Sequence, residues 1–150
     1  MKSTSEALAR LTALCAQSEH CISDIRSRLD TWEIDDEDER QKIIDYLTQN
    51  NFIDEYRYCR AYVNDRLRYA RHGRIKMAAA LRQKHLPADA ISQALEQLDD
   101  ELYVQTLNDL IQSKRRTTHA PDEYQLRAKL IRFAQSRGFE LDLILDQLQE

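Results

Sequence analysis

The chain has 150 residues, of which 42% are hydrophobic and 32% charged, and its formal net charge is −4. Because it holds only two glycines and two prolines, the turns that hairpins and sheets need are nearly absent, and an all-α fold is predicted. No apolar run approaches the roughly 20 residues of a membrane span and the N-terminus lacks a signal-peptide core, so we expect a cytoplasmic protein without a membrane partner. The three cysteines are odd in number and widely spaced, which favours reduced thiols over disulfides.

The first fifty residues predict three helices. We expect Ser5 to cap the first, Ser18 to begin the second, and the acidic run Asp35 to Glu39 to lie at the amino end of the third, where negative charge is favourable. That run lacks the glycine turn and spaced ligands of a calcium loop, so a metal site is not expected there. Apolar residues at helical steps form the inner faces: Ala7, Leu8, Leu11, Leu14 and Cys15; Cys21, Ile22, Ile25 and Leu29; Ile43, Ile44 and Leu47.

The segment 52–98 predicts three more helices. Tyr58, Tyr62 and Tyr69 recur at helical spacing, and we expect them in the core rather than on a base-stacking surface. A second helix should follow Gly73 and end near Leu86. Pro87 then suits the first turn of a helix over 88–98, since it lacks an N–H group.

The remaining residues predict a helix opened by the acidic residues 99–101, a loop over 117–121, and two further helices. Asp122 is the expected cap of the first of these. Gly138 is placed to end it in a left-handed conformation. The last helix is expected over 141–148, with one strongly apolar side.

An internal repeat links these segments. Leu81, Leu86, Ile91 and Leu95 match Phe133, Phe139, Ile144 and Leu148 at offsets of 52, 53, 53 and 53 residues, and Leu29 and Ile34 precede Leu81 and Leu86 by 52. We therefore predict three tandem three-helix repeats, near 1–50, 51–97 and 98–150. Since so short a unit buries little apolar surface alone, neighbouring repeats should support one another in an elongated, curved array.

Charge is segregated along the chain. Between Arg57 and Leu86, nine basic residues face only Asp65, which leaves +8 there, against −7 before and −5 after. A surplus of this kind predicts a surface for an anionic partner. The expected binding residues are Arg57, Arg60, Arg66, Arg68, Arg71, Arg74, Lys76, Arg82 and Lys84. A possible extension comprises Lys114, Arg115, Arg116, Arg127, Arg132 and Arg137.

An enzymatic function is not expected. With two glycines, no G-x-G-x-x-G, phosphate-binding loop or nucleophile elbow can be written. The four histidines, His20, His72, His85 and His119, are scattered and show no zinc-ligand spacing. We therefore predict neither a metal nor a cofactor.

The amino-acid sequence of the central segment resembles that of the middle module of the RecX family, the regulatory proteins of the RecA recombinase. The likeness lies in Phe52-Ile53-Asp54-Glu55, Arg57-Tyr58, Ala61-Tyr62-Val63, Arg66-Leu67-Arg68, Gly73, Leu81-Arg82-Gln83-Lys84 and Leu86. Lys129-Leu130-Ile131-Arg132-Phe133 and Arg137-Gly138-Phe139 are similar to the family's carboxy-terminal module. The family often has glycine where Arg71 and His85 stand and proline where Arg74 stands. The turn between the first two helices of the middle unit could therefore differ, and a helix could run further through it.

This resemblance implies a protein that lies in the groove of a RecA filament, bridges its subunits and restrains filament growth, strand exchange and ATP hydrolysis. We expect the protein itself to be a monomer. It carries Arg57, Arg66, Arg68 and Arg74 over as charge-pairing residues, with Tyr62 and Leu67 as packing supports. The alternative is direct nucleic-acid binding, in which the same arginines neutralise phosphates and affinity falls steeply with salt. We expect contact with naked DNA to be weak compared with contact with the filament.

Overall fold

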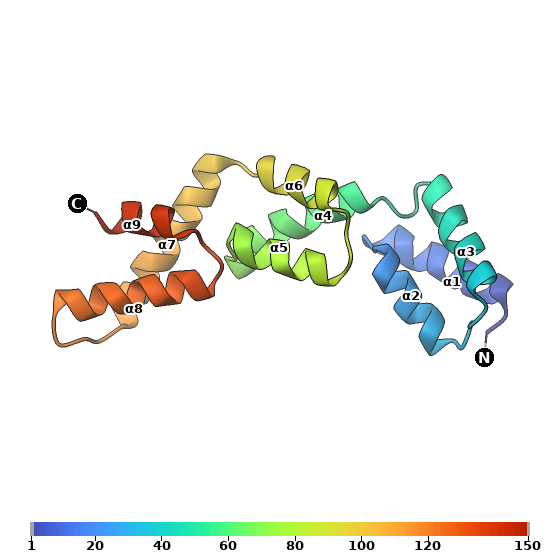
Figure 1. Ribbon diagram of the computed structural model, residues 1–150, viewed down its shortest axis with the longest axis horizontal. Coiled ribbons are helices and arrows are strands. Elements are labelled where there is room, and N and C mark those ends of the chain that lie inside the picture. The colour runs from blue at the N-terminus through green and yellow to red at the C-terminus, as the bar shows by residue number, and fades with distance from the viewer. Residues whose placement is uncertain (1, 150) are drawn as a thin grey trace.

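The computed structural model describes residues 2–149, whose regular secondary structure is helical throughout. Three triplets of helices follow one another along an elongated, bent molecule, with the termini at opposite ends (Figure 1). The predicted all-α array of three-helix repeats is confirmed. The triplets are α1 (Thr4–Gln17), α2 (Ile22–Thr31) and α3 (Glu37–Gln49); α4 (Glu55–Asp65), its π-helical continuation η1 (Arg66–Ala70), α5 (Arg74–Gln83) and α6 (Ala88–Glu96); and α7 (Asp100–Thr117), α8 (Glu123–Ser136) and α9 (Leu141–Leu148). The repeat bounds 1–50, 51–97 and 98–150 remain a prediction, and each falls between two helices.

Two expected helix starts are wrong. The side chain of Ser3, not Ser5, caps α1 by accepting the backbone N–H of Glu6 at 3.1 Å. Ser18 ends α1 in an extended conformation, and α2 begins only after Cys21, whose own N–H donates to the Asp24 carboxylate at 3.1 Å. A helix begins where its free N–H groups find acceptors, and the observed cap residues, Ser3 and Cys21, lie two and three positions from the expected ones.

The later helix ends agree more closely with expectation. Asp36, within the acidic run, caps α3 by accepting two backbone N–H groups, and Asp122 caps α8 by accepting that of Gln125 at 2.8 Å. Pro87 lies immediately before α6 rather than inside its first turn, and α6 ends at Glu96 rather than at Leu98. These acidic caps confirm that the carboxylate run serves a helix end.

The second helix of every repeat ends in the same backbone conformation. Glu33, His85 and Gly138 have φ of 58°, 61° and 96°, and they follow α2, α5 and α8. The next residue in each case donates its N–H to a carbonyl five positions back, a pattern of left-handed helix termination. These bonds are Ile34 to Leu29, Leu86 to Leu81 and Phe139 to Ala134.

These terminal hydrogen bonds confirm the repeat and correct its register. Leu81 corresponds to Ala134, not to Phe133, because both carbonyls accept the equivalent terminal N–H. Ala134 is fully buried, whereas Phe133 is half-buried at the edge of the core. The sequence match of Leu81 with Phe133 was therefore one residue out.

The apolar core is divided unequally among the repeats. The first repeat has its own cluster, which includes Leu11, Leu29 and Leu47. The second and third repeats share one continuous cluster, from Cys59 through Tyr103 to Leu148. Cys21, immediately before α2, is the single described residue of the first repeat among the buried members of the shared cluster.

Candidate binding surface

The nine predicted binding residues of the central repeat fall into two groups. Three of them, Arg57, Arg74 and Lys84, are half-buried and pair with carboxylates of other repeats. Each of these three cations already has an acidic neighbour in this chain, and their part in partner binding stays a prediction. The other six are exposed: Arg60, Arg66, Arg68, Arg71, Lys76 and Arg82.

Arg57 and Lys84 join the central repeat to the first. Arg57 Nε lies 2.6 Å from Glu19 Oε2, and this bond raises the pKa of the guanidinium. Lys84 Nζ lies 3.0 Å from Asp24 Oδ1 and 3.1 Å from the Tyr58 hydroxyl. Burial works against the charge on Lys84, but these two hydrogen bonds outweigh it and raise its pKa.

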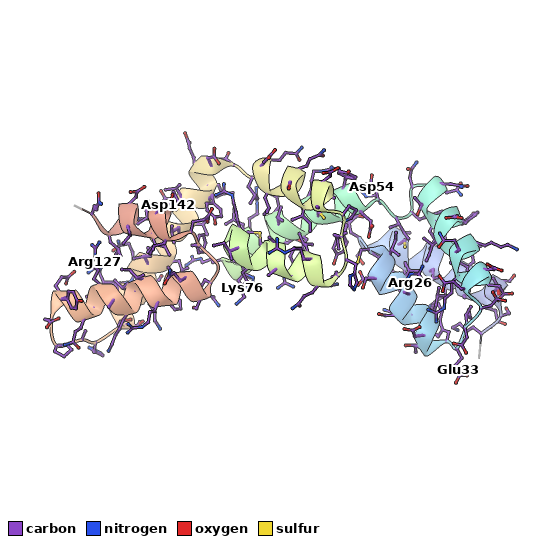
Figure 2. The ribbon with its side chains drawn as sticks, in the orientation of Figure 1. Arg26, Glu33, Asp54, Lys76, Arg127 and Asp142 are labelled. Atoms are coloured by element: carbon purple, nitrogen blue, oxygen red, sulfur yellow. The ribbon has the colours of Figure 1, made fainter. Side chains whose placement is uncertain are left out.

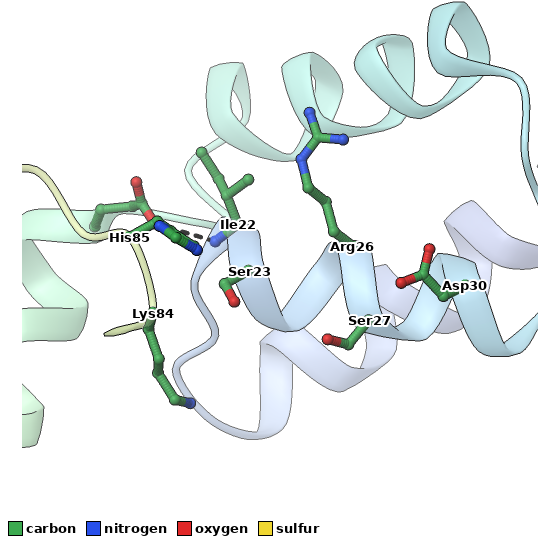
Figure 3. Close-up of a pocket in the computed structure, with 8 residues that line it drawn as sticks. Ile22, Ser23, Arg26, Ser27, Asp30, Lys84 and His85 are labelled. Atoms are coloured by element: carbon green, nitrogen blue, oxygen red, sulfur yellow. Dashed lines mark hydrogen bonds between the residues drawn. The ribbon is translucent and has the colours of Figure 1, made fainter. Parts of the chain in front are cut away.

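A pocket of about 340 Å³ lies between these two repeats, beside the start of α2 (Figure 3). One wall comes from α2, and the facing wall from Glu55, Lys84 and His85 of the central repeat. The Glu55 carboxylate accepts the N–H of Ile22 at 3.1 Å, so a residue of the second repeat caps a helix of the first. Burial raises the pKa of Glu55, and the Ile22 N–H partly offsets this effect.

Arg74 joins the central repeat to the third. Its guanidinium contacts Glu140 at 3.0 Å and Asp100 at 3.2 Å, and stacks 3.8 Å above the Tyr103 ring. The backbone N–H of Arg74 donates to the Tyr103 hydroxyl at 2.8 Å, and that hydroxyl donates to Glu140. Burial and this bond to Glu140 raise the pKa of Tyr103, which keeps its proton in place.

The two glycines of the chain meet at the same junction. Gly73 N–H donates to the Arg137 carbonyl at 2.8 Å, and Ile75 N–H donates to the Gly138 carbonyl at 3.0 Å. A Cβ on Gly73 would lie 2.3 Å from the Gly138 oxygen, and one on Gly138 would lie 2.4 Å from Lys76 Cβ. Both positions therefore require glycine for close backbone approach, and Gly138 also for its positive φ.

The six exposed cations have no carboxylate within ion-pair distance among residues 2–149. They are spread over α4, η1 and α5, and Lys76 projects from the lower edge of the central repeat in Figure 2. Arg66 stacks 5.0 Å from the Tyr62 ring centre, and Lys76 Nζ lies 3.5 Å from the Ser136 carbonyl. These side chains form a candidate surface for an anionic partner.

The tyrosines of α4 and η1 do not all lie in the core as predicted. Tyr58 is buried and Tyr62 half-buried, but Tyr69 is 84% exposed. The helix continues past Asp65 with π-helical winding, which changes the phase of every later side chain. Leu67 is turned into the core, and Tyr69 is turned out to solvent beside Arg66.

Comparisons with known proteins follow the same division into repeats. The sequence model of the RecX second three-helix domain matches residues 54–95, and that of the RecX third three-helix domain matches residues 100–148. The chain belongs to the RecX family. The matched ranges hold α4–α6 and α7–α9 almost completely.

Relatives and solved structures named RecX agree with this membership. A "Regulatory protein RecX" of Clostridium botulinum is 33% identical over 117 residues, covering 77% of this chain and 54% of that protein. This chain thus spans about half the length of that relative. One of Prosthecochloris aestuarii is 29% identical and covers 98% of this chain and 94% of itself. A crystal structure of a regulatory protein RecX has a TM-score of 0.86 at 23% identity and covers 98% of this chain and 72% of that one. The crystal structure of RecX from Lactobacillus salivarius has a TM-score of 0.85 at 20% identity and covers 97% of this chain and 94% of that one.

Two positions at which the sequence departs from the RecX pattern, Arg71 and His85, share a left-handed backbone conformation. Arg71 and His85 stand where the family often has glycine, and both adopt left-handed φ, 53° and 61°. Glycine takes this conformation without steric cost, whereas other residues do not. The first helix of the middle unit continues as η1 and ends at Arg71.

The predicted extension of the RecX basic surface is partly engaged within the chain. Arg115 pairs with Glu123 at 3.0 Å, and Arg127 and Arg137 donate to the carbonyls of Leu148 and Ala70 at 3.4 Å. Lys114 stacks 4.6 Å from the Phe133 ring centre. The two remaining exposed members are Arg116 and Arg132.

A metal site and a reactive thiol are the other kinds of site that the cysteine, histidine and acidic side chains of residues 2–149 could form in this RecX-family chain. No group of three or more histidine, cysteine or acidic side chains in that range is arranged to hold a metal ion. Burial raises the pKa of Cys15, Cys21 and Cys59, the last to about 11, so these thiols are not activated nucleophiles. Over the same range, no helix has the length and apolar character that a membrane crossing needs.

Proposed function

We propose that this protein binds the RecA nucleoprotein filament in its groove and restrains strand exchange and the associated ATP hydrolysis, without catalysis of its own. Membership of the RecX family supports a regulatory role, since the relatives are named regulatory proteins. The elongated array also supports it, because a row of three repeats can follow a helical groove that a compact globule of the same mass could not.

The observation that carries the proposal is the set of exposed cations on the central repeat. Six basic side chains lie on α4, η1 and α5 with no described ion-pair partner, inside a chain that is acidic on both sides. Their self-repulsion is relieved by an anionic partner, either acidic recombinase surface or the phosphates of the bound strand. Arg57 and Arg74 are left out of this surface because they hold the repeats together.

Arg66→Ala combined with Arg68→Ala tests this surface. We expect the concentration needed for half-inhibition of DNA-dependent RecA ATPase to rise roughly tenfold, since about 1.4 kcal/mol of binding would be lost. The free energy of unfolding should change by less than about 0.5 kcal/mol, because both side chains are exposed.

The matched control removes two exposed arginines from the first repeat, Arg10→Ala with Arg28→Ala. It makes the same change in net charge, and its inhibition should equal that of the unaltered protein. Normal inhibition by the Arg66 and Arg68 double variant would place the contact elsewhere on the molecule.

A second candidate function, direct nucleic-acid binding, is favoured by the exposed Tyr69 beside Arg66. A titration of labelled single-stranded DNA, with and without recombinase and nucleotide, separates the two functions. We expect binding to naked DNA to be weak and to fall steeply with salt, and capture by the filament to be much firmer. Equal affinity for naked DNA and filament would remove the ground for the regulatory proposal.

A further inference from the structure

A surface hollow of about 350 Å³ lies where α4 passes into η1. Its lining is Tyr62, Asp65, Arg66, Tyr69 and Ala70, two aromatic rings with one cation and one carboxylate. No aliphatic side chain larger than Ala70 lines it. The lining is therefore unlike the apolar centre of a protein–protein contact and closer to the mixed aromatic and charged surfaces that receive nucleobases.

The backbone around this hollow is held in an unusual conformation. Residues 66–70 wind as a π-helix, a rare form that is frequent at functional sites, and Arg71 follows with φ of 53°. The N–H groups of Arg71 and His72 both donate to the Arg66 carbonyl. The Arg137 guanidinium of the third repeat adds a hydrogen bond to the Ala70 carbonyl at 3.4 Å, so a neighbouring repeat helps to fix the segment.

This conformation places an aromatic ring and cations side by side in solvent. Tyr69 is 84% exposed, although an ordinary helix would turn it toward the core, and the Arg66 guanidinium covers the Tyr62 ring at 5.0 Å. Arg68 and Arg71, both exposed, flank Tyr69 in the sequence. An exposed ring supplies a stacking surface that any base can use, and guanidinium groups supply contacts for phosphates.

We propose that this hollow receives an unpaired base of a single-stranded nucleic acid. The base stacks on the Tyr69 ring, Arg66 and Asp65 offer a donor and an acceptor at its edge, and Arg68 and Arg71 meet the adjoining phosphates. A polyanion fits better than an acidic protein segment, because the hollow pairs a cation with two aromatic rings and holds no large aliphatic side chain. The inference rests on the proposed function only in placing both contacts on the central repeat, and its test needs no recombinase.

The test is a fluorescence-anisotropy titration of the full chain at low salt with two labelled probes of equal length. One is a single-stranded oligothymidylate, and the other carries abasic sites throughout, so that it keeps its phosphates but has no bases. We expect Tyr69→Ala to weaken binding of the first probe roughly tenfold and to leave the second unchanged, since only stacking is lost. Tyr69→Trp should restore binding of the first probe.

Tyr124→Ala is the matched control, because Tyr124 is 82% exposed but follows Asp122 and Glu123. It should bind both probes as the unaltered protein does. Equal loss on both probes, absence of DNA binding at low salt, or capture of an acidic polypeptide in preference to DNA would each overturn the base-binding site. Inhibition of DNA-dependent RecA ATPase by the unaltered protein reports on the regulatory function without any change in the hollow, so failure of one proposal is distinguishable from failure of the other.

Discussion

The residue after the second helix of each repeat, Glu33, His85 or Gly138, occupies the left-handed region in all three copies. Only the third copy uses the residue that adopts this conformation freely. For the other two, contact between Cβ and the backbone costs about 1 kcal/mol each. Burial of Ile34 and Leu86, the next residues in the chain, offsets this strain, because the turn brings both side chains into the core.

His85→Gly should raise the free energy of unfolding by about 0.5 kcal/mol, since relief of the left-handed strain outweighs the extra freedom of glycine in the unfolded chain. Urea unfolding monitored by circular dichroism measures this change. Gln83→Gly, at the exposed last residue of α5, is the control, and it should lower the stability by about 1 kcal/mol. If both variants were destabilised alike, φ at His85 would not be the limiting feature.

At the scale of elements, the sequence predicted where helices lie better than where they begin. Periodic apolar residues located every helix, because burial of one face determines the period. The start at Cys21 was missed because its N–H is satisfied by Asp24, and a cysteine carries no capping signal. The π-helical winding of η1 was also missed, and with it the exposure of Tyr69. Only five residues follow the change in winding, too few for the spacing of apolar residues to reveal it.

The start of α2 also carries a pH-sensitive ion pair. Burial alone would raise the pKa of Asp24, but hydrogen bonds from Lys84 and the Cys21 N–H outweigh it and lower the pKa below its ordinary value of 3.8. The stabilisation from Asp24 is thus present above about pH 4 and is lost as the pH falls through the lowered value. The pKa of Lys84 is raised from 10.5, so its contribution is fully present below that pH and is lost as the pH rises through the raised value.

Asp24→Asn should therefore reduce the free energy of unfolding at neutral pH by about 1 kcal/mol, a modest amount because Lys84 is partly exposed. The asparagine oxygen can still accept the Cys21 N–H, so the helix cap is kept. In urea unfolding, the difference from the unaltered protein should shrink progressively as the pH falls below 3.8 and through the lowered pKa of Asp24. Asp146→Asn, on the exposed side of α9, is the control at neutral pH and should leave the free energy of unfolding nearly unchanged. A deficit for Asp24→Asn that persisted undiminished in acid would point to a lost cap instead.

At the scale of the whole molecule, the two junctions between repeats differ in kind. The second and third repeats share a core, two backbone hydrogen bonds and the cluster around Arg74. The first repeat has a separate core and meets the second through Cys21, two ion pairs and the Glu55 cap. The first junction therefore depends on charge to a degree that the second does not.

Arg57→Gln combined with Lys84→Gln should loosen the first junction alone. We expect amide hydrogen exchange at the start of α2 to become roughly tenfold faster, while exchange in α7–α9 stays unchanged. Arg60→Gln with Arg82→Gln alters net charge equally without touching an ion pair, and should leave exchange unaffected. Uniform acceleration along the chain would show that the three repeats unfold as one unit.

The tandem array was predictable because burial positions recur along the sequence at nearly constant offsets. The roles of Arg57 and Arg74 were not predictable, since their partners Glu19 and Glu140 lie 38 and 66 residues away. A charge surplus along the sequence does not distinguish a cation that faces solvent from one turned toward the next repeat. The bend between repeats decides this, and no local pattern encodes it.

The contact of Gly73 with Gly138 limits how the rod can deform. Two main chains that touch without intervening side chains can neither slide past nor tilt toward each other, because atoms closer than van der Waals contact repel steeply. The backbone contact between Gly73 and Gly138 thereby fixes the angle between the last two repeats. The outward-facing residues of these repeats can then diversify under selection for different partners while the span they present stays constant.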